Sequence, residues 1–284
     1  MANVESIAVT WDLEWDDEVD VVCTGAGLAG LAGAISAVDG GAEVLVARAP
    51  VPPAGSRPGW FTLENDDGET AAYLGALAED LDAGALSQLD DDLPIRPAPE
   101  PAAAPGRRIP PFVGSQLRDW TARCIPSPSG YLYTRVTDWT STTMQTGDGD
   151  ALEVTEIGSM APEPSDIVGS VLQWLDEEAR MRDVDMRAVT GFERLVFEER
   201  DVIGAVFTTA DGPFAVRARH GVLFCGASFP AVRPPPRPAT GDEVLRVALV
   251  GKAASRFGRV ELLMSEPAVS RSVTASSGPA SEVR

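Results

Sequence analysis

A glycine pattern between a short apolar run and a helical segment constrains this chain more than any other stretch. Residues 20 to 30 read DVVCTGAGLAG, which places Gly-x-Gly-x-x-Gly directly after three apolar residues. We expect Gly25 to allow a tight turn, Gly27 to let backbone N–H groups approach a pyrophosphate, and Gly30 to let a helix pack close to the strand. The phosphates would lie at the helix N-terminus, where unpaired N–H groups and the helix dipole favour negative charge.

The residues that follow the glycines complete a strand–helix–strand unit. Apolar residues recur there at steps of three and four, which predicts a helix with one apolar face, at Leu28, Leu31, Ile35 and Val38. Two glycines end this helix, and residues 43–46 form a second apolar strand. Strand, helix and strand thus fit within about thirty residues, as a dinucleotide-binding βαβ unit requires.

The end of the second strand departs from the usual dinucleotide-binding pattern. An Asp or Glu normally stands there and binds the adenosine ribose, but this chain has Ala47. The neighbouring Arg48 allows another interpretation, contact with a ribose 2′-phosphate as in NADP-binding proteins, although an arginine at a strand end is more commonly a surface residue.

Charge and cysteine content exclude several classes of function. The 43 acidic residues outnumber the 23 basic ones, and the net charge of -20 repels nucleic acid and anionic membranes. No run of eighteen apolar residues and no signal-like N-terminus is present, so we expect a cytoplasmic protein. Three separated cysteines and one histidine support neither a disulfide framework nor a metal site, and His220 is expected to be structural or exposed rather than catalytic.

The remainder of the chain divides into recognisable segments. We expect residues 1–18 to form an arm that lays its aromatic side chains on the protein body. Helical spacing returns over 70–89, whereas 94–111 is rich in Pro and Ala and predicts a surface loop. The stretch 112–160 is predicted to be irregular or to form short strands, and 264–284 to be a flexible tail.

The second half of the chain predicts a helix followed by strands. Asp166 begins a helix that extends to 182. The strands are then expected at 184–189, 194–198, 202–208, 214–219 and 221–227. The pair Asp211–Gly212 predicts a hairpin, and the last strand is apolar with small residues at its tip, as suits a buried parallel strand that ends near a cofactor.

This order of parts resembles the flavoprotein family of fumarate reductase, succinate dehydrogenase flavoprotein subunits and 3-ketosteroid dehydrogenases. The glycine turn is intact, and residues 194–206 are similar to the family's Arg-Leu-Ile and Val-x-Gly-Val meander. Residues 224–227, Phe-Cys-Gly-Ala, match its Ala-Thr-Gly-Gly in part. Residues 239–243, with Val244, Ala248 and Ala253 after them, are similar to its Thr-Gly-Asp-Gly and following helix.

The resemblance implies a fold, a cofactor and a set of binding residues. The fold is α/β, a Rossmann-like FAD-binding domain over 19–263 with a parallel sheet and a β-meander, and the substrate-capping domain is reduced or absent. The cofactor is FAD. Its binding residues would be Gly25, Ala26, Gly27, Leu28, Ala29, Gly30, Ala47, Arg48, Gly55, Ser56, Phe192, Cys225 and Gly226.

Three functions are compatible with these residues. The first is an FAD-dependent oxidoreductase acting on a small organic or steroid-like substrate, with a partner subunit or a second copy of the chain supplying the missing cap. The second is an inactive relative whose scaffold binds another protein, and the third is an NADP-binding oxidoreductase that uses Arg48. The resemblance carries over no catalytic residue, because the family's catalytic groups lie mostly in segments that this chain lacks.

Overall fold

The fold was obtained as a computed structural model. It describes residues 13–50, 60–61, 65–81, 93–98, 100–101, 114–135, 141–146, 151–226 and 243–264. The helices are α1 (Leu28–Asp39), α2 (Gly68–Ala78), α4 (Gly114–Cys124) and α5 (Ile167–Met181). The strands of the first half are β1 (Asp17–Cys23), β2 (Val44–Arg48), β3 (Ile95–Pro97), β4 (Glu100–Pro101), β5 (Gly130–Tyr133) and β6 (Thr142–Gln145). Those of the second half are β7 (Ala151–Met160), β8 (Asp185–Ala188), β9 (Gly191–Glu198), β10 (Asp201–Thr209), β11 (Gly212–Cys225), β12 (Leu245–Gly251) and β13 (Phe257–Met264).

One mixed sheet connects all of these strands. Its main path runs β4-β6-β7-β12-β13-β5-β11-β1-β2-β8. The pairs β11–β1, β1–β2 and β2–β8 are parallel, whereas every pair on the path from β4 to β11 is antiparallel. The predicted α/β class, with a βαβ unit and a parallel sheet, is confirmed.

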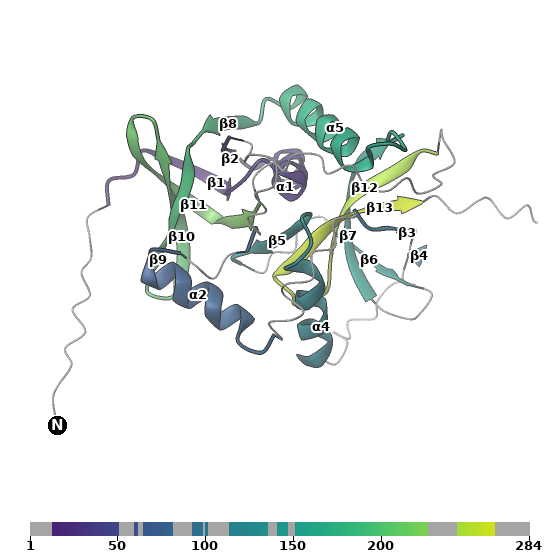
Figure 1. Ribbon diagram of the computed structural model, residues 1–284, viewed down its shortest axis with the longest axis horizontal. Helices are drawn as coiled ribbons and strands as arrows, with labels where there is room; N and C mark the ends of the chain where they lie inside the picture. The colour runs from purple at the N-terminus through teal and green to yellow at the C-terminus, as the bar shows by residue number, and fades with distance from the viewer. Residues whose placement is uncertain are drawn as a thin grey trace, which may run out of the picture.

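Helices cover both faces of the sheet (Figure 1). On one face, α1 and α5 share a buried cluster with β1, β12 and β13, which includes Ile35, Leu175 and Val260. On the other face, α2 and α4 pack with β5, β11 and β12 through Leu74 and Trp120. The core is therefore a three-layer arrangement, and the apolar face predicted for α1 is the face that packs on the sheet.

The β-meander predicted from the sequence is present, but its last strand is longer than expected. β9, β10 and β11 pair in antiparallel order, and the predicted Asp211–Gly212 hairpin joins β10 to β11. The two strands expected at 214–219 and 221–227 are one continuous strand. Gly221 has a positive φ of 137°, and the register with β1 shifts between Val19 and Val21, so a bulge at this point bends the strand without ending it.

Trp15 and the helix over 166–182 agree with the sequence-based expectations. Trp15 lies against Gly204 of the meander, where an added Cβ would meet its ring at 2.7 Å, whereas Trp11 lies outside the described residues. The expected start of α5 is confirmed, because the Asp166 carboxylate accepts a hydrogen bond from the Gly169 N–H at 3.0 Å.

Three expectations about secondary structure are wrong. The helix that the resemblance implies after Glu243 is strand β12, because Val247 and Val250 are β-branched and the segment pairs with both β7 and β13. The stretch 112–160 contains an eleven-residue helix, α4, and a ten-residue strand, β7. The proline-rich segment, expected to be a surface loop, contains β3 and β4. Each of these strands pairs with one neighbour only, and at such an edge a proline costs no ladder hydrogen bond.

The described ranges contain no helix long and apolar enough to cross a membrane.

Candidate functional site

The glycine turn joins the end of β1 to the start of α1, as the sequence predicts. Gly27 is the N-cap residue of α1, with an extended backbone conformation and no side chain to satisfy the first amides of the helix. Residues 21–30 are all buried. In an α-helix the N–H groups of the first turn have no partner within the helix. Those of Leu28 and Ala29 therefore point out of the N-terminus of α1.

Gly30 has the close contact expected of the third glycine. A Cβ atom at this position would lie 1.8 Å from the carbonyl oxygen of Gly25 and 3.0 Å from the sulfur of Cys225. Backbone atoms cannot yield at such a distance, so the approach of α1 to β1 requires glycine here.

The end of β11 closes the turn from the other side. The Thr24 hydroxyl donates a hydrogen bond to the Cys225 carbonyl at 3.1 Å and accepts one from the Cys225 N–H at 3.0 Å. The Gly27 N–H donates to the Gly226 carbonyl at 3.2 Å. The structure therefore brings Cys225 and Gly226 to the glycine turn, and the Gly27 amide is used for this contact instead of pointing at a ligand.

The end of β2 lies beside β1, and its two predicted site residues are a buried alanine and an arginine that is already in an ion pair. Ala47 is fully buried among apolar side chains. The Arg48 guanidinium forms an ion pair with Asp176 of α5 and also contacts the Met186 sulfur at 2.8 Å. A 2′-phosphate at Arg48 would therefore have to compete with a carboxylate that is already in contact.

The remaining predicted site residues lie apart from the turn or outside the described part of the chain. Phe192 is in β9, and its ring lies 5.2 Å from that of Phe224, on the face of the sheet opposite α1. Gly55 and Ser56 are outside the described residues.

No thiolate is available at the turn. Burial raises the pKa of the Cys225 thiol to about 12 and holds the pKa of Cys23 well above its usual value. Both thiols stay protonated at neutral pH and act as small apolar side chains, as the sequence predicts. His220 lies on the surface, 3.5 Å from a carboxylate oxygen of Asp20. Within the described ranges, no three His, Cys, Asp or Glu side chains gather as they would around a metal ion.

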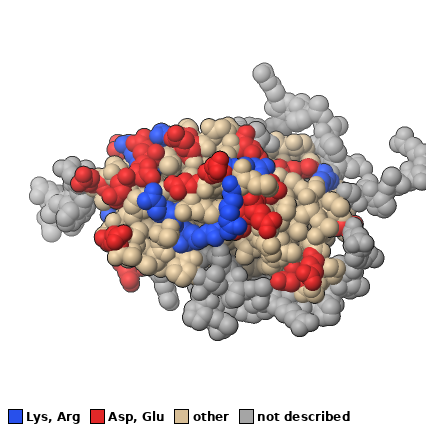
Figure 2. Space-filling view, turned by 90° about the horizontal axis from the view of Figure 1, so that it is seen from above, with Lys and Arg blue, Asp and Glu red and all other residues tan. Residues whose placement is uncertain are grey.

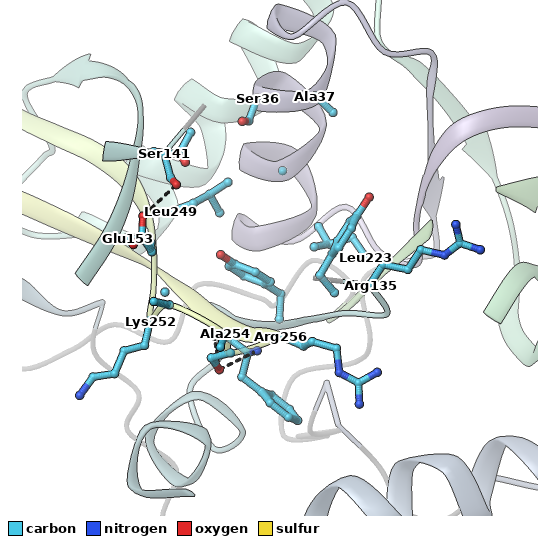
Figure 3. Close-up of a pocket in the computed structure, with 18 of the residues that line it drawn as sticks. Ser36, Ala37, Arg135, Ser141, Glu153, Leu223, Leu249, Lys252, Ala254 and Arg256 are labelled. Carbon is cyan, nitrogen blue, oxygen red and sulfur yellow. Dashed lines mark hydrogen bonds between the residues drawn. The ribbon is translucent and has the colours of Figure 1, made fainter. Parts of the chain in front are cut away.

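A cavity of about 480 Å³ lies further along α1, against the same sheet, and none of the predicted site residues lines it. It is bounded by the last turns of α1, by β5 and by the inner face of β6, β7 and β12 (Figure 3). Its lining includes Ser36, Tyr131, Tyr133, Glu153, Leu223 and Leu249. The one signal in the sequence is the alternation of two tyrosines with a buried leucine over 131–133, which predicts a strand with one aromatic face.

Comparisons with known proteins yield low similarity. No family model and no curated protein matches the sequence. Among solved structures, a 3-ketosteroid-Δ4-(5α)-dehydrogenase from Rhodococcus jostii RHA1 is 20% identical over 76% of this chain and 47% of its own, with a TM-score of 0.32. A flavocytochrome c3 fumarate reductase is 16% identical over 76% of this chain and 34% of its own (TM-score 0.30), and the flavin-dependent brominase Bmp2 is 12% identical over 88% and 56% (TM-score 0.30).

This chain spans between a third and somewhat more than half of these structures. Similarity at these identities and TM-scores does not indicate what this chain does, so its function has to be inferred from the geometry of the glycine turn.

Proposed function

We propose that this chain binds FAD at the glycine turn and serves as an FAD-dependent oxidoreductase acting on a small organic substrate. The observation that carries the proposal is the contact of Gly30 with the Gly25 carbonyl, where a Cβ would stand at 1.8 Å. This contact brings the N-terminus of α1 against the ends of two parallel strands, β1 and β11. In α/β folds such a crevice at the carboxyl ends of the strands is the place where dinucleotides bind.

The residues present fit the pyrophosphate of FAD better than its adenosine ribose. On the pyrophosphate side, the first-turn amides of Leu28 and Ala29 supply donors at the positive end of the helix dipole. On the ribose side, Ala47 offers no carboxylate, which costs about 2 kcal/mol, or more than tenfold in affinity. FAD would supply the redox chemistry, and the residues of this chain would bind and orient it.

A partner subunit or a second copy of this chain would cover the bound flavin. Flavin chemistry requires a pocket that excludes water and positions the substrate, and no residue at the described turn is placed to act as an acid or base. We therefore propose that the covering surface comes from another polypeptide.

Titration with FAD tests the proposal. The full chain is titrated with FAD while flavin fluorescence is monitored, and we expect saturable quenching in the micromolar range. Ala47→Glu places a carboxylate at the end of β2; because Ala47 is fully buried among apolar side chains, circular dichroism first establishes that the variant folds, and the folded variant is expected to bind FAD about tenfold more tightly. Ala49→Glu, which adds the same charge just beyond the strand, serves as the matched control and is expected to leave the affinity close to that of the native chain.

The absence of saturable flavin binding by both the native chain and Ala47→Glu would overturn the proposal. The same titration with NADP and NAD, on the native chain and on Arg48→Ala, distinguishes the nicotinamide alternative. Because Arg48 is paired with Asp176, we expect no preference for NADP.

A further inference from the structure

The cavity beneath the last turns of α1 is separate from the glycine turn. None of residues 24–30 lines it, and Ala37 at the cavity lies nine positions after Leu28 along α1, about 13 Å away. Leu223, which also lines the cavity, accepts a hydrogen bond from the Thr24 N–H of the turn at 3.0 Å. Both Ala37 and Val21 of β1 line the cavity, and the hairpin turn between β12 and β13 forms its rim. An inference about this cavity therefore does not rest on FAD binding.

A glycine at the end of β12, Gly251, leaves part of the cavity floor open. Gly251 of β12 is in register with Gly258 of β13 and, on its other side, with Glu153 of β7. A Cβ on Gly251 would meet no atom closer than 3.8 Å, so its missing side chain leaves free space beside Glu153. Over Gly258, the hydroxyl of Tyr131 already occupies the place of a side chain, at 2.3 Å from an added Cβ.

Glu153 presents a fixed carboxylate to this space. Its two oxygens accept hydrogen bonds from the Ser141 hydroxyl at 2.9 Å and from the Thr143 hydroxyl at 3.0 Å. Each carboxylate oxygen has a further lone pair, so the group can accept more hydrogen bonds without losing these two. Burial raises the pKa of Tyr131 and Tyr133, which therefore line the cavity as neutral phenols.

The cationic side chains that line the cavity are directed elsewhere. Lys252 lies over the Trp120 ring of α4, with 5.8 Å between its ammonium and the ring centre. Arg256 donates to the Tyr73 hydroxyl at 3.0 Å, and Arg135 donates to the Arg219 carbonyl at 3.4 Å. In Figure 3 all three side chains extend away from the centre of the cavity. The carboxylate of Glu153 thus has no cation in contact with it inside the cavity among the described residues.

We propose that this cavity binds a small organic amine in its ammonium form. The ammonium group donates hydrogen bonds to Glu153, and the apolar body lies against Leu223 and Leu249 and along the tyrosine rings of β5. The volume of about 480 Å³ is within the range of cavities that enclose small-molecule ligands. The strongly acidic chain also favours the approach of cations from solution.

Three probes of the same shape and different charge test the proposal. They are 2-phenylethylamine, which is a cation at pH 7, the neutral 2-phenylethanol and the anionic 3-phenylpropionate. Isothermal titration calorimetry on the full chain, with and without added FAD, measures their affinities. We expect saturable binding of the amine, at least about tenfold tighter than the alcohol, and no binding of the carboxylate.

Three variants, one of them a control, locate the binding site. Glu153→Gln keeps the shape of the side chain and removes the charge, and its amide can accept from one of the two hydroxyls and donate to the other, so the preference for the amine over the alcohol should disappear. Glu156 lies in the same strand as Glu153, but it is exposed and pairs with Arg246. Glu156→Gln is therefore the matched control and should leave the preference for the amine intact. Gly251→Val fills the free space with a residue suited to a strand and should abolish binding of all probes.

Several outcomes would overturn the proposal. It fails if none of the probes binds, if the alcohol or the carboxylate binds as tightly as the amine, or if Glu153→Gln retains the preference. Should Glu153→Gln not fold, the probe series on the native chain and the Gly251→Val variant decide the matter, and amine binding that survives Gly251→Val places the ligand outside the cavity. Loss of FAD binding would leave all of these results unchanged.

Discussion

Thr24 joins the two strands that end at the glycine turn, and its contribution can be measured. The residue is 8% exposed, and its hydroxyl forms hydrogen bonds with both the N–H and the carbonyl of Cys225. Thr24→Val keeps the shape of the side chain but leaves both backbone groups buried without a partner. We expect the free energy of unfolding in urea to fall by about 1–3 kcal/mol.

Thr24→Ser is the control for this prediction. It retains the hydroxyl and loses only a methyl group, so its loss of stability should be clearly smaller than that of Thr24→Val. Equal urea midpoints for the two variants would mean that the paired hydrogen bonds at Cys225 contribute no net stability.

Among the elements, α5 offers the clearest test of a sequence signal. The Asp166 carboxylate caps its first turn by accepting from the Gly169 N–H, and no acidic residue in that turn would replace it. We expect Asp166→Ala to lower the free energy of unfolding by about 1 kcal/mol and to accelerate amide hydrogen exchange in the first turn. Asp166→Asn keeps an acceptor oxygen and should cost only a fraction of that; an equal loss in both variants would contradict the capping role.

The elements that the sequence predicted are those with local signals. β1, α1 and β2 follow from the glycine turn and apolar spacing, and α5 follows from its capping residue and apolar face. β12 was expected to be a helix because a resemblance at residues 239–243 was extended beyond them. Its strand form depends on pairing with β7, about ninety residues earlier, and with β13. Local sequence does not contain that information.

The glycine turn and the cavity also differ in how far local sequence predicts them. The glycine turn and the position of the end of β11 beside it were predictable, because the fingerprint fixes the turn and the order of strands brings β11 next to β1. The engagement of the Gly27 amide and of Arg48 was not, because each partner lies more than a hundred residues away in the sequence. The cavity depends on the register of Glu153 with Gly251, which is likewise set by long-range pairing.

For the molecule as a whole, the excess of acidic residues should oppose folding. Ion pairs such as those of Arg219 with Asp20, Glu18 and Glu43 relieve part of the repulsion, and the hydrogen bond from Arg219 lowers the pKa of Asp20. Figure 2 shows acidic and basic side chains interspersed over the face that carries α5 and β8. The 23 basic residues nevertheless cannot pair with all 43 acidic ones.

We therefore expect the melting temperature at pH 7 to rise as sodium chloride is increased from low concentration to about 0.5 M, where the Debye length falls to a few ångströms. Calorimetry at several salt concentrations measures this, and sucrose at equal osmolality controls for effects unrelated to charge. A melting temperature that falls steadily with salt would mean that the ion pairs outweigh the repulsion.

The pairing of β1 with β11 has a consequence for how the chain is made. During synthesis β2 follows β1 within about thirty residues, but the other edge of β1 pairs with a strand that ends at Cys225. Thr24 and its partner Cys225 are 201 positions apart. Until β11 has emerged, an apolar strand edge stays open, which slows folding and favours aggregation. Production at low temperature or with chaperones should therefore raise the yield of folded protein.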